Sequence, residues 1–137
     1  MADGLLRKKV NDLGLDWTVD SAGTADFHVG KPADPRMRKT ALSFNVSLEE
    51  LRARQFTVSD FDDFDLIYAM DSSNLSNILQ HARNEGDSRK VALILNELYP
   101  GKNLEVPDPY YGGEQGFVDV YNMLDEATNR IIEKLRK

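Results

Sequence analysis

Hydrophobic runs and amphipathic stretches take turns along the chain. Residues 66–70 and 91–95 are hydrophobic at every position, which is typical of strands that a parallel sheet buries on both faces. Elsewhere hydrophobic residues recur at intervals of three and four, the spacing of a helix that packs one side on a core. This spacing predicts helices over residues 5–14, 35–44, 73–81 and 114–137. Trp17–Val19 is expected to form a further strand.

The alternation of strands and helices predicts one α/β domain over residues 1–137. Parallel strands need long crossover connections, usually helices, so we expect a parallel sheet flanked by helices on both faces. Functional residues of such sheets gather beyond the carboxyl ends of the strands. Asp71–Asn74 follow the 66–70 run directly and offer helix-capping side chains. The sequence therefore predicts a strand-to-helix junction at this point.

The charge balance argues against nucleic acid as a partner. The formal net charge is −6, whereas affinity for DNA or RNA depends on lysine and arginine neutralising phosphates. No run approaches the roughly 20 apolar residues of a membrane span, and Met1–Lys9 lack the apolar stretch of a secretory signal. We expect a soluble, cytoplasmic protein that binds neither nucleic acid nor a membrane.

The chain contains no cysteine. This excludes disulfides, cysteine-ligated metals and every mechanism in which a thiolate of this chain attacks a substrate. His28 and His81, the two histidines, lie far apart in unrelated patterns, so no histidine metal site is expected. The sequence implies no metal and no cofactor.

Several short motifs together indicate a family. They are Asp-Ser-Ala-Gly-Thr at 20–24, Ala-Arg-Gln at 53–55, Phe-Asp-Leu-Ile at 64–67, Met-Asp-Ser-Ser-Asn-Leu at 70–75 and Val-Pro-Asp-Pro-Tyr-Tyr-Gly-Gly at 106–113. The motifs occur in the order and approximate spacing seen in the low-molecular-weight protein tyrosine phosphatases. The chain resembles this family from Met1 to the last helix.

The resemblance implies a flavodoxin-like sheet whose first, central strand leads into a Cys-x5-Arg loop. In that loop the thiolate attacks phosphorus, while backbone N–H groups and the arginine surround the phosphate. Met1–Leu6 resembles the segment that follows this loop, so the strand and the loop are expected upstream of Met1. The chain is then an N-terminally truncated phosphatase and is predicted to be inactive. Whether coding sequence for the loop precedes Met1 in frame decides between a misassigned start and a native pseudophosphatase.

The resemblance also assigns site residues. Asp108 matches the general acid that protonates the leaving phenolate; alternatively it is an ordinary turn residue of a Pro-Asp-Pro sequence. Tyr110 and Tyr111 resemble aromatic residues beside the pocket mouth, or are ordinary half-buried tyrosines. Phe27 matches the aromatic residue of the opposite pocket wall, and His28 lies beside it. Such a pocket would take a phosphotyrosine protein or a small aryl phosphate.

The chain departs from the family pattern at Leu51, where many relatives carry a histidine that supports the phosphate loop. Arg54 is expected to be structural, because the family's transition-state arginine lies in the loop. Asp71 and Ser72 are expected to cap the helix that follows them.

Other functions fit less well. Arsenate reductases share the implied fold but also depend on cysteines. A receiver domain would bind Mg²⁺ through acidic residues, but the acidic run at 60–65 precedes its strand and reads as a solvated turn. A non-catalytic pseudophosphatase or interaction module remains the alternative.

The missing central strand would expose two rows of backbone groups, which cost about 1 to 3 kcal/mol each when buried without partners. We expect one of two outcomes. Either the flanking segments at 17–19 and 66–70 close up, or their edges pair with another molecule and give a homodimer.

Overall fold

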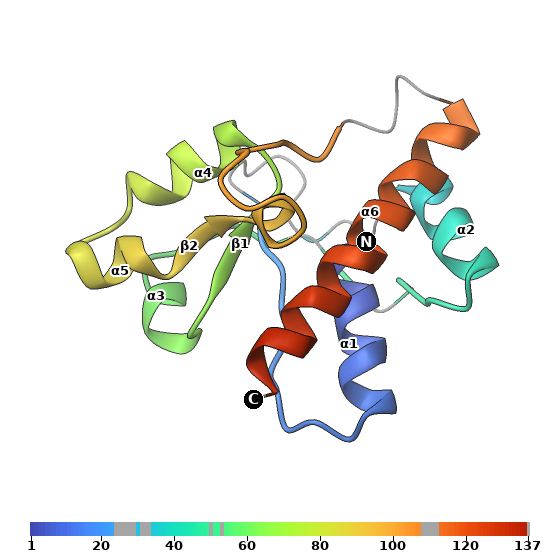
Figure 1. Ribbon diagram of the computed structural model, residues 1–137, viewed down its shortest axis with the longest axis horizontal. Coiled ribbons are helices and arrows are strands. Elements are labelled where there is room, and N and C mark those ends of the chain that lie inside the picture. The colour runs from blue at the N-terminus through green and yellow to red at the C-terminus, as the bar shows by residue number, and fades with distance from the viewer. Residues whose placement is uncertain (24–29, 31–33, 50, 53, 108–112, 137) are drawn as a thin grey trace.

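The computed structural model describes residues 1–23, 30, 34–49, 51, 52, 54–107 and 113–136. Its regular elements are helices and two short strands (Figure 1). In chain order they are α1 (Ala2–Asp12), α2 (Pro35–Ser43), α3 (Asp60–Asp63), β1 (Ile67–Ala69), α4 (Ser72–Leu79), α5 (Glu85–Arg89), β2 (Val91–Leu93), the 3₁₀ helix η1 (Ile94–Glu97) and α6 (Gly113–Leu135).

β1 and β2 pair in parallel. The paired positions are Ile67 with Val91, Tyr68 with Ala92 and Ala69 with Leu93. The connection between the strands runs through α4 and α5, as a parallel pair requires. The predicted parallel strands at 66–70 and 91–95 are therefore confirmed, although each is shorter than its hydrophobic run.

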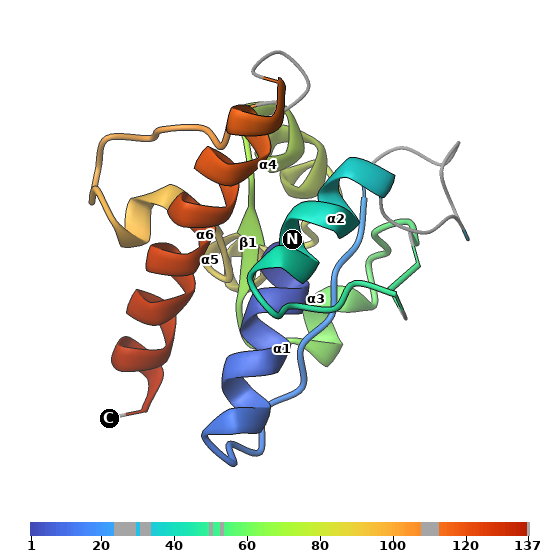
Figure 2. The ribbon, with the colours of Figure 1, turned by 90° about the vertical axis from the view of Figure 1, so that its right-hand side faces the viewer.

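Helices cover the sheet on both faces. Ala69 and Leu93 pack with Ile78 of α4 in one apolar cluster. Tyr68 and Met70 point to the opposite face and pack against the larger cluster built from α1, α2 and α6. Figures 1 and 2 show α4 and α5 on one side of the strands and α1, α2 and α6 on the other. The expected α/β arrangement is present.

Local sequence explains where the shorter helices begin. Asp34 accepts a hydrogen bond from the Arg36 N–H, and Pro35 occupies the first helical position of α2. Asp71 accepts from the Asn74 N–H at 2.7 Å and so caps α4, as expected from the sequence. The capped start of α4 fixes the strand-to-helix junction after β1.

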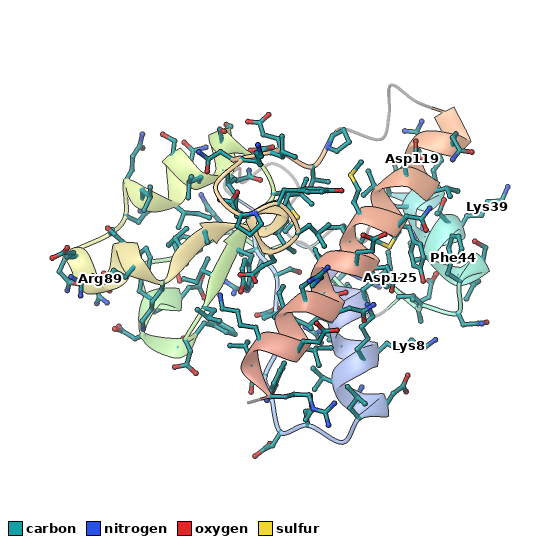
Figure 3. The ribbon with its side chains drawn as sticks, in the orientation of Figure 1. Lys8, Lys39, Phe44, Arg89, Asp119 and Asp125 are labelled. Atoms are coloured by element: carbon teal, nitrogen blue, oxygen red, sulfur yellow. The ribbon has the colours of Figure 1, made fainter. Side chains whose placement is uncertain are left out.

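The long helix α6 holds the larger cluster together. Its apolar stripe, predicted from the sequence, is buried against α1, α2 and η1; its members are Phe117, Val120, Leu124, Ala127 and Ile131. Phe44, at the end of α2, stacks on Tyr121 of α6 with ring centroids 3.8 Å apart (Figure 3). Among the described helices, α6 included, none combines the length and apolarity needed to cross a membrane.

The strand predicted over Trp17–Val19 does not form, although burial alternates along it as in a strand. Residues 15–22 belong to no regular element, and Gly23, directly after them, makes an isolated parallel bridge to Gln55. A strand needs a hydrogen-bonded neighbour along its length. Here the nearest strand, β1, lies across a cavity that both segments line. The prediction of extended backbone with alternating burial agrees with the structure, but the predicted pairing with a neighbouring strand is not present along these residues.

Candidate active site

The site residues predicted from the sequence lie outside the described part of the chain. These are Phe27, His28, Asp108, Tyr110 and Tyr111. Their assignments stay predictions. What the structure does show is where the neighbouring described segments, ending at Gly23 and at residue 107, are held.

The segment before Asp108 is fixed at the carboxyl end of β1. The Val106 N–H donates to the carbonyl oxygen of Met70 at 2.8 Å. Two residues after Met70, the Ser72 N–H donates to Oε1 of Glu105 at 2.9 Å. This hydrogen bond lowers the pKa of Glu105 below its usual value. Residue 107 therefore lies at the end of β1 where chemistry was expected.

The segment before Phe27 is fixed by a second pairing. The Gly23 N–H donates to the carbonyl oxygen of Arg54, and the Phe56 N–H donates to the carbonyl oxygen of Gly23, both at 2.8 Å. These two bonds form the parallel bridge to Gln55. They tie the Asp-Ser-Ala-Gly-Thr motif to the Ala-Arg-Gln motif, two of the segments on which the family resemblance rests.

A carboxylate–arginine cluster of Asp3, Arg7, Asp20, Ser21, Arg54 and Asp60 lies beside this bridge. Ser21 Oγ donates to Asp3 at 2.6 Å, and Arg7 binds the other oxygen of the same carboxylate. Arg54 Nε donates to Asp20 at 3.0 Å. The cluster thus joins α1, the 15–22 segment and α3. With three carboxylates and two guanidinium groups, its net charge is −1.

The Arg54 guanidinium forms hydrogen bonds to two carboxylates of this cluster. Its two terminal nitrogens donate to the two oxygens of Asp60, each at 3.0 Å. Hydrogen bonding to Asp60, opposed by burial and reinforced by Asp20, raises the pKa of Arg54. A guanidinium held by two carboxylates is a structural group, as expected from the sequence, and is not poised to bind a phosphate.

A cavity of about 940 Å³ lies between β1 and the 16–22 segment. α1 and α6 contribute to its walls, as do Arg54 and Asp60 of the cluster. Leu51, the position where relatives carry a histidine, also lines it and packs on the larger core cluster. This side chain offers no hydrogen bond to the cavity. The departure from the family pattern therefore places an apolar side chain at this point of the wall.

The expectation that the flanking segments close up is wrong for the described residues. β1 pairs only with β2 among them, and the cavity separates it from residues 16–22. α1 and α6 stand behind the gap, and Lys9 ties them together through hydrogen bonds to Asp125 and Thr128 at 2.7 Å.

The acidic run at 60–65 does not form a metal site. Asp60 is bound by Arg54, and Asp62 by Arg83 at 2.7 Å. Within the described ranges, no group of three or more histidine, aspartate or glutamate side chains is placed to hold a metal ion. Arginine pairing explains these carboxylates better than the Mg²⁺ site of a receiver domain.

Sequence reasoning missed the contact between Asp3 and Ser21. Asp3 is 7% exposed although it carries a charge. Its position next to an apolar helical stripe gave no signal, since an aspartate in the first turn of a helix is common. Ser21 lies within a recognised motif, but only the fold brings it to α1.

Comparison with known proteins agrees with the motifs. Residues 1–137 match the family "Low molecular weight phosphotyrosine protein phosphatase". A phosphatase of this description from Schizosaccharomyces pombe is 38% identical, covering 98% of this chain and 87% of the relative; the human protein is 32% identical, with 98% and 85% covered. The crystal structure of a protein tyrosine phosphatase from Entamoeba histolytica superposes with a TM-score of 0.89 at 36% identity, covering 98% of this chain and 86% of that one. The chain belongs to the low-molecular-weight phosphotyrosine protein phosphatase family.

Proposed function

We propose that these 137 residues supply the scaffold, the general acid and the pocket walls of a protein tyrosine phosphatase but do not hydrolyse phosphomonoesters on their own. The observation that carries the proposal is the absence of cysteine from the sequence. A family relationship provides the fold, but it does not provide the sulfur atom that this chemistry requires.

The reaction needs a bond that this chain cannot form. A thiolate forms a phosphorus–sulfur bond while the bond from phosphorus to the phenolic oxygen breaks, and a general acid gives the phenolate its proton. Water then hydrolyses the phosphocysteine. Asp108 is the proposed acid; in support, Val106, two positions earlier, is held at the carboxyl end of β1.

Aromatic side chains support phosphotyrosine as the substrate class. Phe27, Tyr110 and Tyr111 are proposed to line a slot that suits a phenyl ring, with His28 at its edge. The partner is then a phosphotyrosine protein or a small aryl phosphate. Cytoplasmic localisation and a homodimer through strand edges stay predictions.

Turnover of p-nitrophenyl phosphate tests the proposal. We expect no hydrolysis by the purified chain under conditions in which the Schizosaccharomyces pombe relative is active. An Asp108→Asn variant distinguishes the source of any residual signal, because a contaminating phosphatase does not respond to the substitution. Hydrolytic activity that co-purifies with the chain and is lower in the Asp108→Asn variant would refute the proposal. It would require another nucleophile.

The absence of a thiol also favours a second candidate, a pseudophosphatase that binds phosphotyrosine without cleaving it. Calorimetric titration with a phosphotyrosine peptide and its unphosphorylated counterpart separates the two. Preferential binding of the phosphorylated peptide without turnover supports the pseudophosphatase, whereas equal affinity supports a purely structural role.

A further inference from the structure

A shallow groove of about 430 Å³ runs along helix α4. The helix lies on the opposite side of the strands from α1, α2 and α6 (Figures 1 and 2). The lining residues recur at intervals of three and four and so form one stripe along the helix; they are Ser72, Leu75, Ser76, Leu79 and Gln80. Leu79 is 39% exposed, and Ser72, Ser76 and Gln80 are exposed as well. The stripe is an outer surface of the molecule, whereas Ile78 of the same helix is buried.

The groove is uncharged. Residues 72–82 contain no aspartate, glutamate, lysine or arginine, although 29% of the chain is charged. Charged side chains are depleted at the centres of protein interfaces. Two copies of this chain, each with a net charge of −6, repel each other. An uncharged face is where two such copies meet at the smallest electrostatic cost.

The order of side chains along the groove is self-complementary. A two-fold axis at Ser76 runs two α4 helices antiparallel and places the Ser72 hydroxyl of each copy opposite the Gln80 amide of the other. Hydroxyl and amide groups both donate and accept hydrogen bonds. Leu75 of one copy then lies beside Leu79 of the other. The small serine at the crossing lets the two helices approach closely, because side chains at the contact set the distance between helix axes.

Charges at the two ends of the groove favour this antiparallel orientation. Asp71 and Glu105 lie at the amino-terminal end, where each accepts a backbone N–H of α4. Arg83, 43% exposed, follows the carboxyl-terminal end. Together with Lys90 it balances the two aspartates that it binds. An antiparallel pair brings each carboxylate end to a balanced end, whereas a parallel pair would bring four carboxylates together.

We propose that the groove on α4 is a contact surface between two copies of this chain, which pack their α4 helices antiparallel about a two-fold axis at Ser76. A helix of 8 residues covers less than the roughly 800 Å² per partner of a standard interface. The complex is therefore weak, with a Kd on the order of 100 µM to 1 mM. This self-association goes beyond the phosphatase assignment and does not depend on catalysis.

Single-cysteine crosslinking tests the two-fold contact, because the chain contains no cysteine of its own. A disulfide forms when two Cα atoms come within about 4.4 to 6.8 Å of each other. Ser76→Cys should therefore give a disulfide-linked dimer under mild oxidation. Ser73→Cys is the matched control, since Ser73 is exposed on the same helix but does not line the groove. Equal crosslinking of the two variants would overturn the proposal, because it would reflect random collision.

Sedimentation equilibrium of the unmodified chain tests the association itself, at concentrations from about 10 µM to 1 mM. Ser76→Arg places two like charges face to face at the crossing, so the Kd should rise about tenfold or more. Asn129→Arg makes the same change in net charge at an exposed position of α6 and should leave the Kd within about twofold. Both variants should keep the wild-type circular dichroism spectrum, since both positions are exposed.

Three results in sedimentation would overturn the proposal. The first is a monomer at the highest concentration reached. The second is an equal rise in Kd for Ser76→Arg and Asn129→Arg, which would assign the effect to overall charge. The third is a dimer that Ser76→Arg leaves intact, which would place the contact between copies on another surface.

Discussion

Arg54 and Asp60 form a two-pronged ion pair in which each terminal guanidinium nitrogen lies 3.0 Å from one carboxylate oxygen. The Asp60 side chain is 7% exposed and that of Arg54 34%. Asp60 also accepts the Thr57 N–H at 2.9 Å. This pair joins the Ala-Arg-Gln motif to the start of α3 and so sets one wall of the cavity.

Replacing Arg54 should expose how much this pair stabilises the fold. Arg54→Ala leaves the buried Asp60 carboxylate without its main partner, so the free energy of unfolding should fall by about 2 kcal/mol. Arg89→Ala is the control, since Arg89 and Glu85 form an exposed pair at the far edge of the molecule (Figure 3). It should cost under about 0.5 kcal/mol. Urea denaturation measures both, and equal losses would contradict this role.

The contribution of Arg83 to the free energy of unfolding should vary with pH. Hydrogen bonds from Arg83 lower the pKa of Asp62 and Asp87 below the usual 3.8. A carboxyl whose pKa is depressed on folding stabilises the fold above its unfolded pKa, and this contribution is lost as pH falls through the folded pKa. The difference in free energy of unfolding between wild type and Arg83→Gln should therefore be largest above about pH 5 and should decrease toward pH 2. Urea midpoints across this range measure it; a constant gap would rule out linkage to these carboxylates.

Gly4 provides a packing test. A Cβ at this position would lie 2.3 Å from Cδ2 of Leu48, which is 1% exposed. Gly4→Ala should lower the free energy of unfolding by about 1 to 3 kcal/mol, despite the helix propensity of alanine. Combining it with Leu48→Val should cost less than the sum of the two single changes. Additive costs would show that the backbone moves instead.

Thr128 joins α1 to α6 through Lys9. The hydroxyl of Thr128 donates to the Leu124 carbonyl oxygen and accepts from Lys9 Nζ, both at 2.7 Å. Thr128→Val keeps the shape but removes the acceptor, so it should cost about 1 kcal/mol. A double-mutant cycle with Lys9→Met should show a combined loss smaller than the sum. Independent losses would mean that the pair contributes nothing.

The helices could be predicted from the sequence more fully than the sheet. Apolar residues from Phe117 to Ile131 recur at helical spacing, and helix α6 forms over them. Trp17–Val19 shows equally good local signals, yet no ladder forms there. A helix satisfies most of its backbone hydrogen bonds within itself, whereas a strand depends on a neighbouring strand that is often distant in sequence.

Part of the candidate site could also be predicted from the sequence, whereas its long-range contacts could not. The motifs indicated the family and Asp108, and composition excluded a thiol of this chain. They could not show that the segment before Asp108 is tied to Met70, or that Ser21 binds Asp3. Both contacts join residues that are distant along the chain.

The sequence by itself determined the family, the alternation of helices and strands, and the lack of a cysteine nucleophile, because these follow from residue identity and local spacing. Only the tertiary structure decided that β1 and residues 16–22 stand apart around a cavity. α1 and α6 line this cavity and are joined by contacts such as Lys9 with Thr128, and the energy of such long-range packing is not contained in any local stretch of residues.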